Sequence, residues 1–339
     1  MKRFEGYMRG INLGGWLSQC AEYSEGHYSS FITENDIKNI SEWGLDHIRL
    51  PVDYNVIEDE DGRILPNGYK HIDDCIEWCE KYGLNLIIDL HKTKGFAFDD
   101  TAENNIMFDS HELQKRFISL WTNIAARYGK NGNVVFEPLN EVSKIDSRKW
   151  NALISKLLSA IRPFAPDKKI IFGGTQWNSV HTLQLLEIPD DKNIVYNFHF
   201  YEPFLFTHQH ASWLSAVSDI SMRYPGTMEI YRKTSENIGC FGSGLKNTDE
   251  MGAEFMDKLI SEAVDAAVNA DVPLYCGEYG VIDQAVISDT AVWFEDIHSV
   301  FEKHGIGRAV WTYKEMNFGI NDEHYAPVSY THLRAHETS

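Results

Sequence analysis

Two glutamates follow apolar, strand-like segments at distant points of the sequence. Glu141 comes after the run at 134–139, and Glu278 comes after the run at 272–275. An ionised carboxylate at the end of a buried strand is costly unless its chemistry is needed there. Two carboxylates in the same context therefore predict a catalytic pair.

A pair of carboxyl groups can hydrolyse a glycosidic bond with retention of configuration. One group acts first as an acid and then as a base, and the other is a nucleophile about 5 Å away. Their environments must differ, so that one is protonated while the other is ionised. Arg49 and Tyr201 are candidates to keep Glu278 ionised, because a nearby guanidinium favours a carboxylate. Asn140 is a candidate donor to a sugar 2-hydroxyl, and Trp311 offers an apolar face on which a pyranose ring can stack.

Eight short, β-prone runs must position these residues. They begin at residues 9, 47, 85, 134, 169, 194, 273 and 308. Each is nearly continuously apolar, which is typical of parallel strands covered on both faces. Helical patterns lie between them, near 33–44, 69–82, 113–129, 150–161, 255–268 and 292–301. The alternation predicts an α/β fold, a single (β/α)8 TIM barrel over residues 1–339.

Polar or aromatic residues stand at the carboxyl ends of all eight predicted strands, where the active sites of such barrels lie. In chain order they are Asn12, Arg49, His91, Asn140 with Glu141, Trp177, His199 with Tyr201, Glu278 and Trp311. A scaffold that only packs does not need such residues at every strand end. We assign Glu137, which lies deeper in the fourth strand, to the supporting scaffold.

The interval between predicted strands six and seven is about twice the usual barrel repeat. We expect an insertion subdomain at about 202–249 on the active-site face. It either shapes a substrate cleft or forms a surface excursion with its own small core. Trp16, Trp177 and Trp213 are candidate platforms for sugar rings.

Composition narrows the class of partner. The formal net charge of -19 argues against nucleic acid and anionic membranes, and a neutral substrate fits it better. The sequence has no signal-peptide pattern and no apolar run of about 18 residues, so we expect a cytoplasmic chain, or a secreted one if a leader was removed. The five cysteines contain no CxxC pair, which disfavours a disulfide framework or a zinc site. We expect Cys75 and Cys79 in the core.

From end to end the chain resembles glycoside hydrolase family 5, the cellulase family. The resemblance rests on RGINLGGW, HIRLPVDY, DLHK, PLNEV, VYNFHFY, YCGEYGVI and VWTYK. Within the family the chain is most similar to the leaderless bacterial endoglucanase C type, which also has a large insertion after strand six.

The resemblance implies a retaining endo-β-1,4-glucanase acting on β-1,4-glucan or mixed-linkage β-1,3-1,4-glucan, as polysaccharide or oligosaccharide. It implies Glu141 as acid/base and Glu278 as nucleophile, with no cofactor and no metal. We expect a monomer. The resemblance also implies six residues around the reacting sugar, Arg49, His91, Asn140, His199, Tyr201 and Trp311.

Other functions stay open on the residues alone. A β-mannanase or an exo-β-1,3-glucanase would use the same carboxylate pair. A metal-dependent barrel hydrolase would use His91 and His199, although such barrels commonly have a His-x-His at the end of strand one, where residues 12–14 read Asn-Leu-Gly. A barrel that binds carbohydrate without catalysis would not need both carboxylates.

The C-terminus departs from the family pattern. A closing helix is expected after strand eight, but residues 329–339 lack an apolar stripe of helical period. We interpret this stretch as a non-native tail, such as a cloning or assembly scar.

Overall fold

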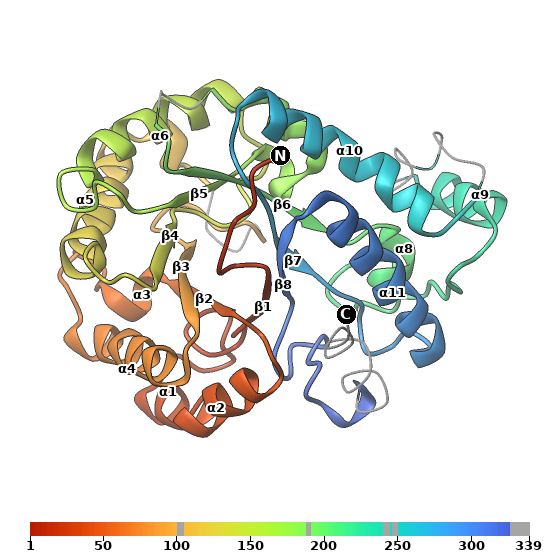
Figure 1. Cartoon of the computed structure of the whole chain (residues 1–339), viewed down its shortest axis with the longest axis horizontal. Coiled ribbons are helices and arrows are strands. Elements are labelled where there is room, and N and C mark those ends of the chain that lie inside the picture. The colour runs from red at the N-terminus through yellow and green to blue at the C-terminus, as the bar shows by residue number, and fades with distance from the viewer. Residues whose placement is uncertain (100–104, 188–190, 240–244, 246–249, 326–339) are drawn as a thin grey trace.

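The strands form a closed parallel barrel in the order of the sequence, which confirms the predicted fold class. The computed structural model describes residues 1–99, 105–187, 191–239, 245 and 250–325 (Figure 1). The strands are β1 (Arg9–Asn12), β2 (His47–Asp53), β3 (Asn85–Lys92), β4 (Val134–Glu137), β5 (Ile170–Gly173), β6 (Ile194–Phe200), β7 (Leu274–Tyr279) and β8 (Gly307–Val310). The barrel closes where β1 pairs with β8, with Gly10 opposite Ala309.

Helices surround the strands (Figure 1). The long ones are α4 (Pro66–Tyr82), α5 (His111–Tyr128), α6 (Ser147–Ile161), α10 (Ala253–Asn269) and α11 (Ile287–His304). Shorter elements are α1 (Glu25–Phe31), α2 (Glu34–Glu42), α3 (Tyr54–Ile57), η1 (Met107–Asp109), α7 (Thr175–Asn178), η2 (Val180–Leu185), α8 (Phe204–Thr207), α9 (Met228–Ile238) and η4 (Glu323–Tyr325). Their apolar faces pack on the outer face of the barrel, and Cys75 and Cys79 are buried there as expected.

Some strands are shorter than the apolar runs suggest. β4 ends at Glu137, because Pro138 has no N–H with which to continue the ladder. β8 ends at Val310. Asn140 and Glu141 therefore lie in the loop after β4, and Trp311 directly follows β8.

Alternate residues of the strands point into the barrel and form layers, as the period of two requires. The layer nearest the amino ends of the strands is apolar. Its side chains are Phe4, Tyr7, Ile87, Val135, Ile171, Val195, Tyr275 and Ala309. Two residues further along their strands come Asp89, Glu137 and Asn197, which are buried polar side chains. Another two residues further come His91 and His199. The barrel interior thus changes from apolar to polar toward its carboxyl end.

A bulge in β7 turns Glu278 into the barrel. Phe198 of β6 pairs with Cys276, whereas His199 pairs with Glu278, so Gly277 is the extra residue. Strict alternation from the inward-facing Tyr275 would aim Glu278 outward, and an extra residue reverses that direction. A Cβ at position 277 would lie 2.8 Å from the side-chain amide of Asn197 and 3.1 Å from His199 Nε2, so only glycine fits.

The segment between β6 and β7 carries α8 and α9, with α9 at the periphery of the molecule (Figure 1). Phe206, Tyr224 and Tyr231 are buried within it, and Trp213 is exposed. Tyr224 Oη donates to Asp296 Oδ2 of α11 at 2.7 Å, which joins the segment to the barrel.

The predicted tail at 329–339 falls outside the described residues, as do residues 240–244 and 246–249 of the predicted insertion. Cys20, Cys75, Cys79 and Cys276 are buried free thiols. In the described part of the chain, no helix is both long enough and apolar enough to cross a membrane.

The bulge generates a stability prediction. Gly277→Ala should lower the free energy of unfolding by about 1–3 kcal/mol, because the added methyl group overpacks the barrel interior. Urea denaturation measures this. Gly132→Ala is the control, since a Cβ there meets nothing within 4 Å. Equal stability of the two variants would contradict the prediction.

Candidate active site

A single buried guanidinium organises the carboxyl end of the barrel. Arg49 of β2 is fully buried, and its three nitrogens make contacts of 2.7–3.0 Å with five side chains. These partners are Asn12, Asp89, Glu137, Asn140 and Glu278. Burying a cation is tolerated only when it is paired and hydrogen-bonded, and Arg49 meets both conditions. The bidentate bond to Glu137 fits the supporting role expected for that residue.

Glu278 receives one donor on each carboxylate oxygen. Arg49 Nη1 donates to Oε1 at 2.7 Å, and Tyr201 Oη donates to Oε2 at 3.0 Å. Burial raises the pKa of Tyr201 well above its ordinary value, so its hydroxyl keeps the proton that it donates. A negative charge on Glu278 is thus balanced by a cation and by a hydrogen bond.

Glu141 has a different environment. Burial raises the pKa of its carboxyl group to about 8, although the charge of Arg49 acts in the opposite direction. Its backbone is left-handed, with a φ of 42°, which is uncommon for a residue other than glycine and is typical of functional positions. Its Oε1 lies 2.7 Å from Nδ1 of His199, and burial lowers the pKa of that imidazole to about 4. The neutral ring adds no positive charge beside Glu141.

The two glutamates face each other across the barrel. One oxygen of Glu141, one oxygen of Glu278 and a nitrogen of His199 all lie within 4.8 Å of one another. Side-chain exposure is 13% for Glu141 and 7% for Glu278. Two carboxyl groups are therefore close together, one with a raised pKa and one with a cationic partner.

His91 and Trp311 adjoin this network. His91 Nδ1 lies 2.6 Å from Asp89, its Nε2 lies 2.8 Å from the amide nitrogen of Gln19, and burial lowers its pKa to about 4. The Trp311 ring is parallel to the His91 ring, with 5.7 Å between their centroids. Gly14 provides the space, because a Cβ there would lie 2.8 Å from the Trp311 ring.

The structure thus brings together the predicted pair Glu141 and Glu278 and the six residues expected around the reacting sugar. The prediction that Trp16 is a sugar platform is wrong. Its ring is fully buried against Trp78, and its Nε1 donates to the Tyr28 carbonyl at 2.7 Å. An apolar ring with a satisfied N–H is typical of a core tryptophan. Trp177 and Trp213 are exposed, at 41% and 57%.

Sequence reasoning missed several supporting residues. Asp89 and Asn197 stand inside the runs NLIIDL and IVYNFHF, and a polar residue within an apolar strand is a signal that could have indicated them. Asn178 gave no such signal, since it lies beyond β5 and reaches His199 only through the fold.

Three side chains of this site carry atoms that could coordinate a metal ion. Among the described residues, only Glu141, His199 and Glu278 bring three potential donor atoms together, and His91 is not among them. The guanidinium of Arg49 already lies 2.7 Å from Glu278 and would repel a second cation. These residues therefore do not fit a divalent metal, and the His91 and His199 pair of the metal-dependent alternative is not assembled.

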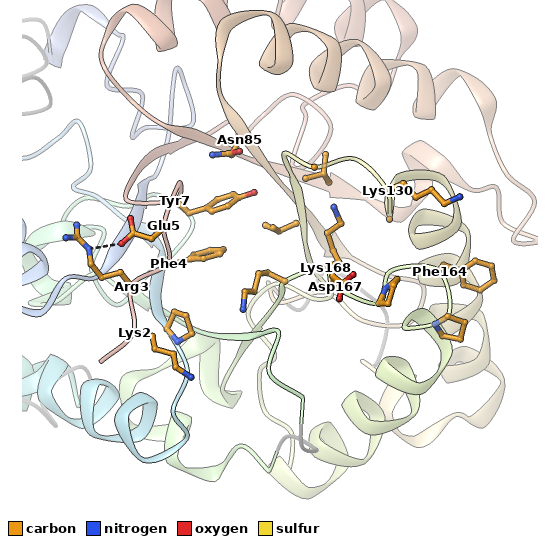
Figure 2. Close-up of a pocket in the computed structure, with 18 residues that line it drawn as sticks. Lys2, Arg3, Phe4, Glu5, Tyr7, Asn85, Lys130, Phe164, Asp167 and Lys168 are labelled. Carbon is orange, nitrogen blue, oxygen red and sulfur yellow. Dashed lines mark ion pairs between the residues drawn. The ribbon is translucent and has the colours of Figure 1, made fainter.

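A cavity of about 1120 Å³ lies at the opposite end of the barrel, beside the start of β3 and β4 (Figure 2). Several of its charged groups have partners. Arg3 pairs with Glu5, Lys2 with Asp271, and Lys168 donates to the Asn131 carbonyl. No pair of facing carboxyl groups occurs among its lining residues.

The barrel and the facing carboxyl pair define a glycoside hydrolase of the (β/α)8 class. The model of the cellulase family, glycosyl hydrolase family 5, matches residues 10–317. The chain belongs to this family, as its motifs indicated.

Relatives match over nearly the whole chain. It is 43% identical to cellodextrinase A of Ruminococcus flavefaciens, over 91% of this chain and 86% of the relative. It is 40% identical to endoglucanase C of Acetivibrio thermocellus, over 95% and 96%. Among solved structures, Thermotoga maritima Cel5A in complex with cellobiose superposes with a TM-score of 0.76 at 25% identity, over 94% of this chain and 93% of that one.

The buried guanidinium generates the second prediction. Arg49→Met should lower the free energy of unfolding at pH 7 by about 3–5 kcal/mol, because it leaves buried carboxylates without a countercharge. The loss should be smaller at pH 5, where the unpaired carboxyl groups can be protonated at lower cost. Urea denaturation at both pH values measures the difference.

Arg148→Met is the control, since Arg148 is an exposed arginine that pairs with its neighbour Asp146. It should leave the unfolding midpoint unchanged. Equal losses for Arg49→Met at both pH values would contradict the electrostatic explanation.

Proposed function

We propose that the protein is a retaining endo-β-1,4-glucanase that hydrolyses β-1,4-glucan or mixed-linkage β-1,3-1,4-glucan by double displacement. The observation that carries this proposal is the pair Glu141 and Glu278, whose oxygens approach within 4.8 Å in opposite electrostatic environments. A short separation favours direct attack by a carboxylate, whereas an inverting enzyme needs about 6.5–9.5 Å to hold a water molecule.

In the first step the Glu278 carboxylate attacks the anomeric carbon. Glu141 is protonated below pH 8 and gives its proton to the glycosidic oxygen as the leaving group departs. A covalent glycosyl-enzyme forms on Glu278. The bonds from Arg49 and Tyr201 hold the nucleophile in position as its charge is consumed.

In the second step the ionised Glu141 removes a proton from water, which attacks the anomeric carbon and releases Glu278. Each inversion reverses the one before, so the product keeps its configuration. Glu141 must therefore be able to switch between both protonation states, and a pKa close to the working pH makes such a group effective.

Asn140 is positioned to bind the sugar. Its Oδ1 accepts from Arg49 at 2.9 Å, which turns its Nδ2 away from the guanidinium and leaves an N–H for a 2-hydroxyl. Nε2 of His91 lies 3.4 Å from Asn140 Nδ2, and the Trp311 ring stacked on His91 offers an apolar face that suits a pyranose ring.

Two observations bear on the substrate. The relatives are named as an endoglucanase and a cellodextrinase, which supports a β-1,4-glucan as polymer or as short oligosaccharide. Thermotoga maritima Cel5A has also been solved in complex with mannotriose, which keeps β-mannanase activity as the second candidate.

The first experiment compares polymers. Purified protein should lower the viscosity of barley mixed-linkage glucan faster than reducing ends appear, and Glu278→Ala should lose this activity while keeping its fold. Carboxymethyl cellulose, laminarin, mannan and cello-oligosaccharides are assayed in parallel. Activity on mannan alone would replace the glucanase proposal, and a wild-type rate in the variant would exclude Glu278 as nucleophile.

Glu141 is tested by the leaving group of the substrate. Glu141→Gln should lose about 10²–10⁴-fold in kcat/KM on glucan, because it cannot protonate the glycosidic oxygen. An aryl cellobioside with a good leaving group needs little protonation, so its cleavage should suffer far less. Comparing both substrates with the same enzyme preparation controls for misfolding. Equal losses on the two would contradict the acid role.

The pH profile follows from the raised pKa. Because Glu141 is the acid, kcat/KM should stay high up to about pH 8 and fall as the pH rises through this value. In Glu141→Gln, the alkaline fall should be absent on the activated aryl substrate. A fall already complete near pH 6 would contradict the assignment of a buried, high-pKa acid.

A further inference from the structure

Asn178 contacts the imidazole that lies beside Glu141. Nε2 of His199 lies 3.2 Å from Nδ2 of Asn178, and Nδ1 lies 2.7 Å from Glu141 Oε1. An amide nitrogen can only donate, so Nε2 accepts, and the proton of the neutral ring lies on Nδ1. His199 then donates to Glu141.

An unusual turn delivers this amide. Gln176, Trp177 and Asn178 have φ values of 55°, 57° and 51°, three successive residues in the left-handed region that disfavours residues other than glycine. The turn exposes Trp177 and buries Asn178 completely. A Cβ on Gly173 would lie 2.0 Å from Asn178 Oδ1, so the position also requires glycine in β5.

The same turn holds the Glu141 loop. The Trp177 N–H donates to the carbonyl of Val142 at 3.2 Å, and Trp177 Nε1 donates to the Phe98 carbonyl at 2.9 Å. Backbone strain that persists must be held in place by surrounding contacts and is characteristic of functional sites. Here the strained residues bond His199 and Val142, the residue that follows Glu141.

We propose that Asn178 is a positioning residue for acid/base catalysis, and that it selects the His199 tautomer that donates to Glu141. This rests on the acid/base role proposed above for Glu141. With Oε1 occupied as an acceptor, the catalytic proton belongs on the other oxygen of Glu141. The donated bond also stabilises the carboxylate that must activate water in the second step.

Other groups also act on Glu141, and a substitution at residue 178 removes none of them. The titratable and charged groups around Glu141 are Arg49, Asp89, His91, Asp99, Glu137, His199, Tyr201 and Glu278. A change in the pH profile of an Asn178 variant can therefore be referred to residue 178 itself, and the state of the His199 ring shows whether the tautomer contributes to it.

Asn178→Asp is the informative variant, because aspartate has the shape of asparagine but accepts where the amide donates. It should move the imidazole proton to Nε2 and turn the Nδ1 lone pair toward Glu141. That arrangement favours the protonated carboxyl group of Glu141, and so does the added negative charge. The pH at which kcat/KM falls on the alkaline side should therefore rise by about half a unit or more. On an aryl cellobioside, where hydrolysis of the intermediate limits turnover, kcat should fall at least about tenfold.

The tautomer is read directly by ¹⁵N NMR of the histidine rings at pH 6.5 without substrate, with the His199 signals assigned by comparison with His199→Gln. We expect an Nδ1–H tautomer in the wild type and an Nε2–H tautomer in Asn178→Asp. Asn151→Asp is the matched control, because Asn151 is a buried asparagine on α6 whose amide donates to the Leu185 carbonyl. This variant should change neither the His199 tautomer nor the pH at which kcat/KM falls.

An Nε2–H tautomer in the wild type would overturn the proposal, and this decides the matter even if Asn178→Asp does not fold. An unchanged alkaline limb in folded Asn178→Asp would also overturn it. The NMR measurement needs no activity, so a failure of the glucanase proposal is recognised separately, by the polymer assay and by Glu141→Gln.

Discussion

The site depends on one buried cation. Arg49 is the centre of a network in which Asp89, Glu137 and Glu278 share a guanidinium that has no access to water. Burial raises the pKa of Asp89 to about 7 and that of Glu137 above its ordinary value, and the charge of Arg49 opposes both shifts. The same guanidinium thus counters the cost of burying all three carboxyl groups.

The geometry of the strands makes this network possible. Residues 87, 89 and 91 of β3 all face the barrel interior. Ile87 belongs to the apolar layer, Asp89 pairs with Arg49, and His91 lies at the carboxyl end of the barrel. β6 repeats the pattern with Val195, Asn197 and His199. Asn197 donates to Glu137 and accepts from the N–H of Gly277, and it thereby ties the charged layer to the bulge that aims Glu278 inward. The charge balance around Arg49 therefore depends on the register of β6 and β7, which places Glu278 beside it.

Much of this was predictable from the sequence, for identifiable reasons. Apolar runs of strand length are local signals, and they sufficed for the eight strands and for the residues at their ends. The bulge at Gly277 and the left-handed turn at 176–178 were not predictable, because both are imposed by contacts with other strands. Trp16 was misassigned because a tryptophan near a strand end has the same local pattern whether it faces a cleft or the core. Only its partners Tyr28 and Trp78 decide which.

The two carboxyl groups are held in different ways, and the difference matches what each must do in the proposed mechanism. Glu278 lies within β7, paired through the backbone with β6 and bonded through both oxygens to side chains, so its position is fixed beside a cationic partner. Glu141 lies beyond the end of β4 on a left-handed residue, next to a neutral imidazole. A nucleophile must keep its charge until it attacks, whereas an acid/base must gain and lose a proton in every cycle. Ionic pairing suits the first requirement. Burial beside a neutral donor suits the second, because it leaves the two protonation states of Glu141 close in free energy near neutral pH.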